Sequence, residues 1–287
     1  HPVRILDAVE ARRATMFVGV PAMYRMLEEA GAADRDLTSV RVWASGADAM
    51  PPELAERFKR MGATVTLPLL GAVGQATFAE GYGMVEVGGG VAAKVSPPFL
   101  GAGRGPLGEA LGFALPGYEM RVVGEDGTEL RGGQVGELQV KGPGVLKAYW
   151  GDEEATAAVL TDDGWLRTGD LARKGPLGLL VFEGRGKHVI KRGGYSVYAL
   201  EVEQVLETHP AVLEASVVGL PDERMGEVPV AAVRLAEGTT LRQAKLGAFA
   251  TEHLAEYKVP TRFVAVDELP RTGTTKVQKS ELLELFA

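Results

Sequence analysis

The sequence predicts an α/β fold followed by an α+β fold: a doubly wound parallel sheet, a small distorted β-barrel and a small α+β domain. Over residues 1–102, apolar strand-like runs alternate with amphipathic helical segments, a pattern that favours a parallel sheet. Over residues 103–184, short β-type runs are separated by glycine turns, which is typical of a small β-barrel or a distorted sheet. Over residues 185–287, helices and strands alternate again in a stretch of ordinary domain size.

The elements of the first part follow from the spacing of apolar side chains. A helix is expected over residues 3–14, where apolar residues recur at helical intervals, and a buried strand over residues 15–20. Pro21 then begins a second helix, because proline is well tolerated in the first helical turn. A strand over residues 39–45 and a helix over residues 51–62 continue the alternation.

The later elements are shorter or less regular. The stretch ATVTLPLLGAVGQATFAEGYG (63–83) is expected to return to the sheet and end in a glycine loop. Residues 117–130 contain two β-type runs around a Gly-Glu-Asp-Gly turn. In the last domain we expect helices over 198–210 and 241–254 and strands over 212–223, 228–237 and 261–269.

Composition excludes several classes of function. The net charge is -7, and duplex binding needs a basic footprint, so we expect no nucleic-acid partner. The chain has no cysteine, which excludes disulfides, cysteine-ligated zinc and a thiol nucleophile. No apolar run approaches the roughly 20 residues of a membrane span, and no signal peptide is recognisable, so we expect a cytoplasmic protein.

Several strings along the chain carry a family resemblance. They are EGYGMVE (80–86), GELQVKGPGVLKAYW (136–150), GWLRTGDL (164–171), GRGKHVIKRGGYSVYALEVE (184–203) and LPRTGTTKVQK (269–279). In this order and at these intervals they resemble the adenylate-forming superfamily, which includes the acyl-CoA synthetases. The resemblance covers essentially the whole chain but only the C-terminal part of the family's length. It implies the end of the large domain, with its doubly wound sheet and distorted barrel, followed by a mobile α+β lid domain.

The resemblance also implies a reaction. The family uses ATP and Mg²⁺ to convert a carboxylate to an acyl-adenylate, and CoA or a carrier-protein pantetheine then takes the acyl group. The strings look most similar to those of fatty acyl-CoA ligases, so a fatty or other hydrophobic carboxylate is expected. Transfer to a carrier protein and a non-catalytic nucleotide-binding relative remain as alternatives.

Two short groups of residues would form the adenine pocket by this resemblance. They are Gly46, Ala47 and Asp48 after a predicted strand, and Gly81, Tyr82 and Gly83 in the glycine-rich string. Tyr82 would stack on adenine, and the glycines would let the backbone approach the nucleotide. Loops between strands and helices often have this composition, so an ordinary connection is the alternative for the first group.

Glu86 would bind the Mg²⁺ that accompanies the ATP phosphates, because Mg²⁺ prefers oxygen ligands. The preceding residue is Val85, where the family usually has a threonine, and valine cannot form that hydrogen bond. Asp170 would accept both ribose hydroxyls, and Arg185 would add a second ribose contact. The alternative for Glu86 is a solvated loop residue, for Asp170 an ordinary turn residue, and for Arg185 a surface residue.

Lys187 occupies the family's hinge position, where backbone rotation would turn the domain that follows. Lys191, Gly193 and Gly194 would then face the active site during thioester formation, and the glycines would leave room for pantetheine. A solvated basic turn is the alternative for Lys191, because charged runs usually lie at the surface.

Lys276 would contact the carboxylate and the α-phosphate while negative charge develops there during adenylation. The family usually has glycine before this lysine, and here the residue is Thr275. The string TGTTK lacks the closing glycine of a phosphate-binding loop, so we set that interpretation aside.

The family's own phosphate-binding loop, a Ser/Thr/Gly-rich string followed by Pro-Lys-Gly, does not occur in these residues. We therefore expect that the 287 residues are a fragment and that they adenylate poorly or not at all. An exposed sheet edge would favour self-association, so a homodimer is one expected state. Association of the whole enzyme with a membrane surface is a further expectation.

Overall fold

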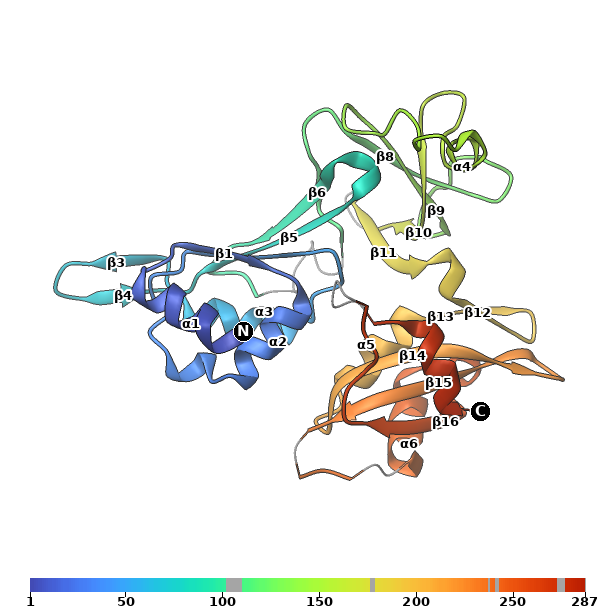
Figure 1. The fold of residues 1–287 in the computed structure, drawn as a ribbon. Coiled ribbons are helices and arrows are strands. Elements are labelled where there is room, and N and C mark those ends of the chain that lie inside the picture. Colours follow the sequence, from blue (N-terminus) through green and yellow to red (C-terminus); the bar gives the residue numbers. More distant parts are fainter. Residues whose placement is uncertain (102–109, 176–178, 237, 241–242, 273–276, 287) are drawn as a thin grey trace. The chain divides into compact units, whose positions relative to one another are not determined.

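A computed structural model describes residues 1–101, 110–175, 179–236, 238–240, 243–272 and 277–286. The chain divides into two compact units. The first contains residues 1–168 and 172–182, and the second contains residues 169–171 and 183–287. Figure 1 labels helices and strands of both units.

The first unit begins with an α/β layer. Its elements are α1 (Pro2–Ala11), β1 (Met16–Gly19), α2 (Pro21–Glu29), η1 (Ala32–Asp34), β2 (Val42–Gly46), α3 (Pro52–Met61), β3 (Val65–Leu67), β4 (Gly71–Val73), β5 (Thr77–Met84), η2 (Val85–Val87), β6 (Gly89–Ser96) and β7 (Phe113–Ala114). The main sheet has the order β1-β2-β5-β6-β7. The pairs β1–β2 and β2–β5 are parallel, whereas β5–β6 and β6–β7 are antiparallel. The predicted parallel sheet is therefore present and is extended by antiparallel strands.

The helices of this layer pack on the sheet through an aromatic core. Tyr24 of α2, Trp43 of β2 and Phe58 of α3 are each at most 1% exposed. The rings of Tyr24 and Trp43 lie edge-on to Phe58, with centroid distances of 4.9 and 5.1 Å. The Tyr24 hydroxyl donates to the carbonyl of Ala44 at 2.8 Å, which satisfies its polar atom inside the core.

The irregular stretch 63–83 returns to the main sheet as expected, but it ends in a strand and not in a glycine loop. Strand β5 continues through Gly83, and its last residues pair with β6 after a register shift between Tyr82 and Gly83. Upstream, β3 and β4 form a separate two-stranded hairpin whose tip residues Leu69 and Leu70 are exposed (Figure 1). The pairing of β5 with β6 depends on residues beyond the string itself, which is why its local composition suggested a loop.

The second layer of this unit contains β8 (Glu119–Val123), β9 (Val135–Lys141), α4 (Glu153–Val159), β10 (Leu166–Lys174) and β11 (Leu180–Arg185). The strands form a sheet with the order β11-β10-β9-β8. Within the described residues this sheet is open, where the sequence favoured a distorted barrel. Closure would require β8 to pair with β11, and these strands are the two ends of the order.

The second unit is an α+β domain. It contains η4 (Gly186–His188), β12 (Val189–Arg192), β13 (Tyr195–Tyr198), α5 (Ala199–Glu207), β14 (Val212–Asp222), β15 (Gly226–Leu235), α6 (Gln243–His253), η5 (Glu256–Lys258), β16 (Arg262–Val266), α7 (Lys279–Leu282) and η6 (Leu283–Phe286). Its sheet has the order β13-β12-β15-β14, with β16 parallel to β15.

Both faces of the long β14–β15 pair are buried, as period-two alternation requires. Val217, Ala231 and Val233 belong to the core that α5 and α6 cover. Val218 and Val230 belong to the opposite core, which includes residues of α7 and η6. The central residues of the pair, Val217–Val218 and Val230–Val233, are therefore apolar on both faces.

Candidate active site

The two predicted groups of adenine-pocket residues meet where the parallel pairing of β2 with β5 ends. Gly46 ends β2 and pairs with Gly81 of β5. Ala47 follows in a left-handed conformation with φ of 69°, so the chain turns sharply away from the sheet. Ligands in open α/β sheets bind beyond the carboxyl ends of the strands, which is where Ala47 and Asp48 lie. Gly81 and Gly83 lie beside them within β5, which continues to Met84.

The side chains around this strand end have defined partners. The Asp48 carboxylate accepts from the backbone N–H of Ala49 at 2.9 Å, as in an ordinary turn. The half-buried Tyr82 ring lies 6.3 Å from the ring of Phe182. The fold thus brings all the predicted residues of this pocket to one edge of one unit, although Asp48 also serves the turn.

Glu86 lies on the short 3-10 helix η2, directly after β5, and is half-buried. The Tyr149 hydroxyl donates a hydrogen bond to Glu86 Oε1 at 3.0 Å. Burial, and then this bond to a carboxylate, raise the pKa of Tyr149. Glu86 is therefore held by a specific partner and is not a freely solvated loop residue, whereas Val85 beside it is 88% exposed.

Asp170 and Arg185 belong to the second unit and lie close together. Arg185 Nε lies 2.9 Å from Asp170 Oδ1 and forms an ion pair with it. The geometry of this contact does not meet that of a hydrogen bond. The Asp170 side chain is 3% exposed and that of Arg185 is 45% exposed. A carboxylate buried to this extent needs a charged partner, so Asp170 is more than a surface turn residue.

The predicted hinge residue Lys187 lies on the 3-10 helix η4 and is exposed. Its neighbour His188 is partly buried among cations. Burial, and then the charges of Lys279, Lys187 and Arg185, lower the pKa of His188 from 6.5 to about 4. Nothing in these contacts tests whether the backbone rotates here, so the hinge stays a prediction.

His188 should make the stability of the second unit pH-dependent. Its folded pKa is below its unfolded value, so the neutral histidine favours the folded state above about pH 6.5. That contribution is lost as the pH falls from 6.5 toward 4, because the unfolded chain binds the proton more readily. We expect the Tm difference between wild type and His188→Asn to shrink over this range in a series of thermal melts. A difference that stays constant with pH would contradict this account.

The predicted thioester-side residues form a tight hairpin. Gly193 and Gly194 connect β12 to β13 with φ of 54° and 85°, a two-residue turn that suits glycine. Lys191 Nζ donates to Ser196 Oγ at 2.9 Å, and its backbone N–H donates to Glu227 Oε2 at 2.8 Å. The Gly193 N–H donates to the carbonyl of Met225 at 2.8 Å. Lys191 is exposed, so its ammonium group is accessible to a ligand.

Lys276 and Thr275 lie outside the described residues. The chain on either side is anchored. Arg271 pairs with Val277 in an antiparallel bridge, and Arg271 also contacts the Glu214 carboxylate at 2.6 Å. Lys279 Nζ lies 2.6 Å from Glu203 Oε1.

Sequence reasoning missed two features of the site. Tyr149 lies in a string that carried the resemblance, but nothing in its spacing indicated that it would contact Glu86. Lys94 of β6 pairs with Glu80 of β5 at 2.9 Å, directly before Gly81. The strand β6 itself was not expected, so this cross-strand ion pair had no detectable sequence signal.

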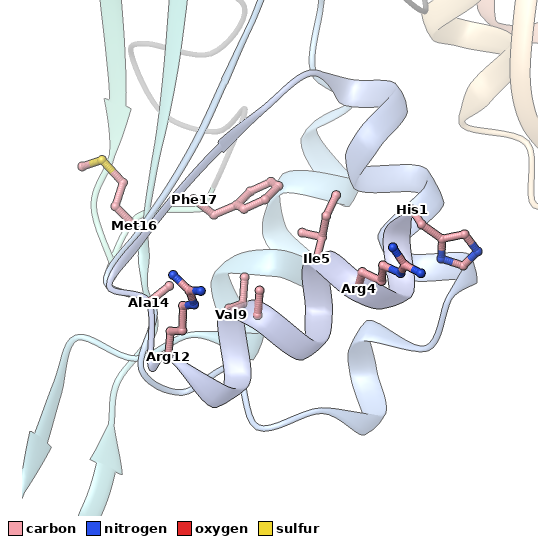
Figure 2. Close-up of a pocket in the computed structure, with 9 residues that line it drawn as sticks. His1, Arg4, Ile5, Val9, Arg12, Ala14, Met16 and Phe17 are labelled. Carbon is pink, nitrogen blue, oxygen red and sulfur yellow. The ribbon is translucent and has the colours of Figure 1, made fainter.

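A separate hollow lies between α1 and the start of β1 and contains none of the predicted site residues. Figure 2 shows Ile5, Val9 and Phe17 lining it, with Arg4 and Arg12 beside them. No group of three or more acidic, histidine or cysteine side chains gathers as a metal site in the described ranges. None of the helices described has the length and apolar character needed to cross a bilayer.

Comparison with known proteins identifies the family. Residues 1–150 match the AMP-binding enzyme family, and residues 201–276 match the AMP-binding enzyme C-terminal domain. The indoleacetate–CoA ligase of Aromatoleum aromaticum is 38% identical over 98% of this chain and 52% of its own length. The long-chain-fatty-acid–CoA ligase of Bacillus subtilis is 34% identical over 99% of this chain and 48% of its own length.

A solved structure agrees with this assignment. ATP-bound MatB from Rhodopseudomonas palustris superposes with a TM-score of 0.83 at 32% identity, over 100% of this chain and 53% of that chain. The chain therefore belongs to the AMP-binding enzyme family, as the strings in its sequence predicted. It spans about half the length of the curated relatives it matches.

Proposed function

We propose that the natural full-length polypeptide containing these residues is an AMP-forming acid–CoA ligase. It would activate a carboxylate with ATP to an acyl-adenylate and then transfer the acyl group to CoA. The observation that carries the proposal is the parallel pairing of Gly46 with Gly81. It supports an adenine pocket at the carboxyl end of β2, beside Gly81 and Tyr82 of β5. The names of the relatives support the same reaction.

Each unit would contribute its own groups to this reaction. In the second unit, Asp170 would accept the ribose hydroxyls and Arg185 would both balance its charge and contact the ribose. Lys191 and the Gly193–Gly194 turn would serve thioester formation. Residues 185–287 would move as one domain about a hinge near Lys187, and residues 1–102 and 103–184 would form parts of the large domain.

The residues present fit Mg²⁺. Proteins hold this ion through one or two carboxylates together with substrate phosphates, so a full cluster of acidic ligands is not required. Glu86 would hold it, and the ion would neutralise charge on the ATP phosphates when bound. These residues would contribute the Glu86 carboxylate and the groups that orient it.

The substrate we propose is a fatty or other hydrophobic carboxylate. It is supported by relatives named for a long-chain fatty acid and for indoleacetate. A relative named as a fatty acid–[acyl-carrier-protein] ligase, at 36% identity, supports a carrier protein as the alternative acceptor. The 287 residues alone would be inactive, because they contain no Ser/Thr/Gly-rich string followed by Pro-Lys-Gly.

The test is AMP release by the full-length polypeptide, assayed with ATP, Mg²⁺, CoA and a panel of carboxylates of different length and ring content. We expect CoA-dependent AMP release with one class of acid and no ATP–pyrophosphate exchange from residues 1–287 alone. Release that needs a pantetheine-bearing protein in place of CoA would support the alternative. Inactivity with every acid and both acceptors would contradict the proposed function.

A further inference from the structure

Three hydrogen bonds fix the turn that carries Glu86, and all come from the segment between Tyr118 and Tyr149. The Tyr118 hydroxyl donates to the carbonyl of Val87 at 3.1 Å. The Leu146 N–H donates to the carbonyl of Glu86 at 2.7 Å. The Tyr149 hydroxyl donates to Glu86 Oε1 at 3.0 Å. Two of these bonds hold the backbone, and only the Tyr149 bond reaches the carboxylate.

We propose that Tyr149 is a positioning residue for the Glu86 carboxylate in the binding of Mg²⁺ and ATP. This inference rests on the proposed function of Glu86. The Tyr149 hydroxyl occupies Oε1 and fixes the side-chain rotamer. Within the described part of the chain, Oε2 has no hydrogen-bond partner, so this oxygen is left for the metal.

The surroundings explain why Glu86 needs such a partner. A glutamate side chain loses considerable rotamer freedom when it is ordered, and η2 is only three residues long. Val85 offers no hydroxyl, and it is exposed. Because Tyr149 orders the Glu86 side chain before the metal binds, Mg²⁺ binding would lose less side-chain entropy.

Tyr149 is itself well placed to be rigid. Its backbone N–H donates to Thr156 Oγ1 at 2.9 Å, and its carbonyl accepts from the N–H of Asp152 at 3.3 Å. The Asp152 side chain caps the helix α4 that follows, through the N–H of Ala155 at 2.8 Å. A capped helix thus anchors the tyrosine whose hydroxyl holds Glu86.

The experiment measures ATP binding by titration calorimetry at increasing Mg²⁺ concentration, with no carboxylate present, in the full-length polypeptide. Tyr149→Phe removes the hydroxyl and keeps the ring. We expect the Mg²⁺ concentration at half-maximal ATP binding to rise by roughly tenfold, the lower range for loss of a partner to a metal-binding group. Tyr118→Phe is the matched control, because it removes a tyrosine hydrogen bond from the adjacent residue's backbone without touching the carboxylate. It should leave the Mg²⁺ midpoint within about twofold of wild type, since the Leu146 N–H still holds the backbone of Glu86 and one neutral hydrogen bond has a small net contribution.

A double-mutant cycle separates this inference from the proposed function. If Glu86→Gln raises the Mg²⁺ midpoint and Tyr149→Phe has no further effect in that background, Tyr149 acts through Glu86. Additive effects, equal shifts in both tyrosine variants, or a fall in the midpoint of Tyr149→Phe would overturn the positioning role. An unchanged midpoint in Glu86→Gln would overturn the role of Glu86 as well. Thermal melts of each variant establish that the compared proteins are folded.

Discussion

Lys276→Ala is expected to slow acyl-adenylate formation by the full-length polypeptide by about 10²-fold or more, the cost of one lost contact to a developing charge. Negative charge accumulates on the carboxylate and the α-phosphate as they react. A lysine ammonium is a compact charge on a flexible stem, which suits brief stabilisation of such a state. ATP–pyrophosphate exchange reports this half-reaction directly.

The same variant should spare the second half-reaction. When the acyl-adenylate is supplied ready-made, Lys276→Ala should form the CoA thioester at a rate close to that of wild type. Lys191→Ala should give the opposite result, with exchange retained and thioester formation slowed. A loss of both half-reactions in Lys276→Ala would contradict the division of roles between these lysines.

Lys279→Ala is the matched control, because this lysine lies three positions further on and has structural partners. Its ammonium group contacts Glu203 Oε1 at 2.6 Å and the carbonyl of Val217 at 3.1 Å. Removing it should lower the Tm, since Glu203 would lose its charged partner. Pyrophosphate exchange by the folded protein should persist. Its loss would show that the effect of Lys276→Ala is not specific to Lys276.

Local patterns in the sequence predicted much of the fold. The helices α2 and α3 and the strands β1, β2, β14 and β15 lie where apolar spacing and proline placed them, within a few residues. Most of these elements are decided by their own residues, because they bury one face or both faces against neighbours of the same unit. The strand β1 was predicted to be buried, but Met16 and Val18 are exposed. Family membership was also predicted from local strings, because they occur in the family's order along the chain.

The elements that were missed depend on partners elsewhere in the chain. The stretch through Gly81 and Gly83 has the composition of a loop, yet it forms a strand because β6 lies beside it. For β8–β11 the sequence allowed a barrel or a distorted sheet, and the described residues form an open sheet. Short strands with glycine turns do not reveal whether the edge strands meet. Tyr149 was overlooked for a related reason, since its contact with Glu86 joins residues 63 positions apart.

The site was predicted unevenly. The resemblance assigned Gly46 and Gly81 to one pocket, and the parallel register of β2 and β5 pairs these two residues. The ion pair of Asp170 with Arg185 was not foreseen, although both residues were singled out. A resemblance supplies the residue types of a site, but the contacts that hold those residues come from the three-dimensional fold.

Gly83→Ala is expected to destabilise the first unit by about 3 kcal/mol, the upper part of the usual range for overpacking. An added Cβ would lie 1.8 Å from the carbonyl oxygen of Gly89 and 2.8 Å from the Cα of Gly90. These are backbone atoms of the paired strand β6, so no side-chain rotation can relieve the contact. The Tm should fall by roughly 6–12 °C for a unit of this size.

Gly81→Ala provides the contrast, because it lies two positions earlier on the same strand. The nearest atom to an added Cβ would be the carbonyl oxygen of Ser45 at 4.0 Å, so the protein itself has room for a methyl group. The Tm should stay close to that of wild type, while ATP or carboxylate binding by the full-length polypeptide should weaken. Normal binding by Gly81→Ala would contradict the placement of the pocket at this strand end. The packing of the strands thus accounts for Gly83, whereas at Gly81 the packing leaves room for a side chain and the proposed pocket is what the variant tests.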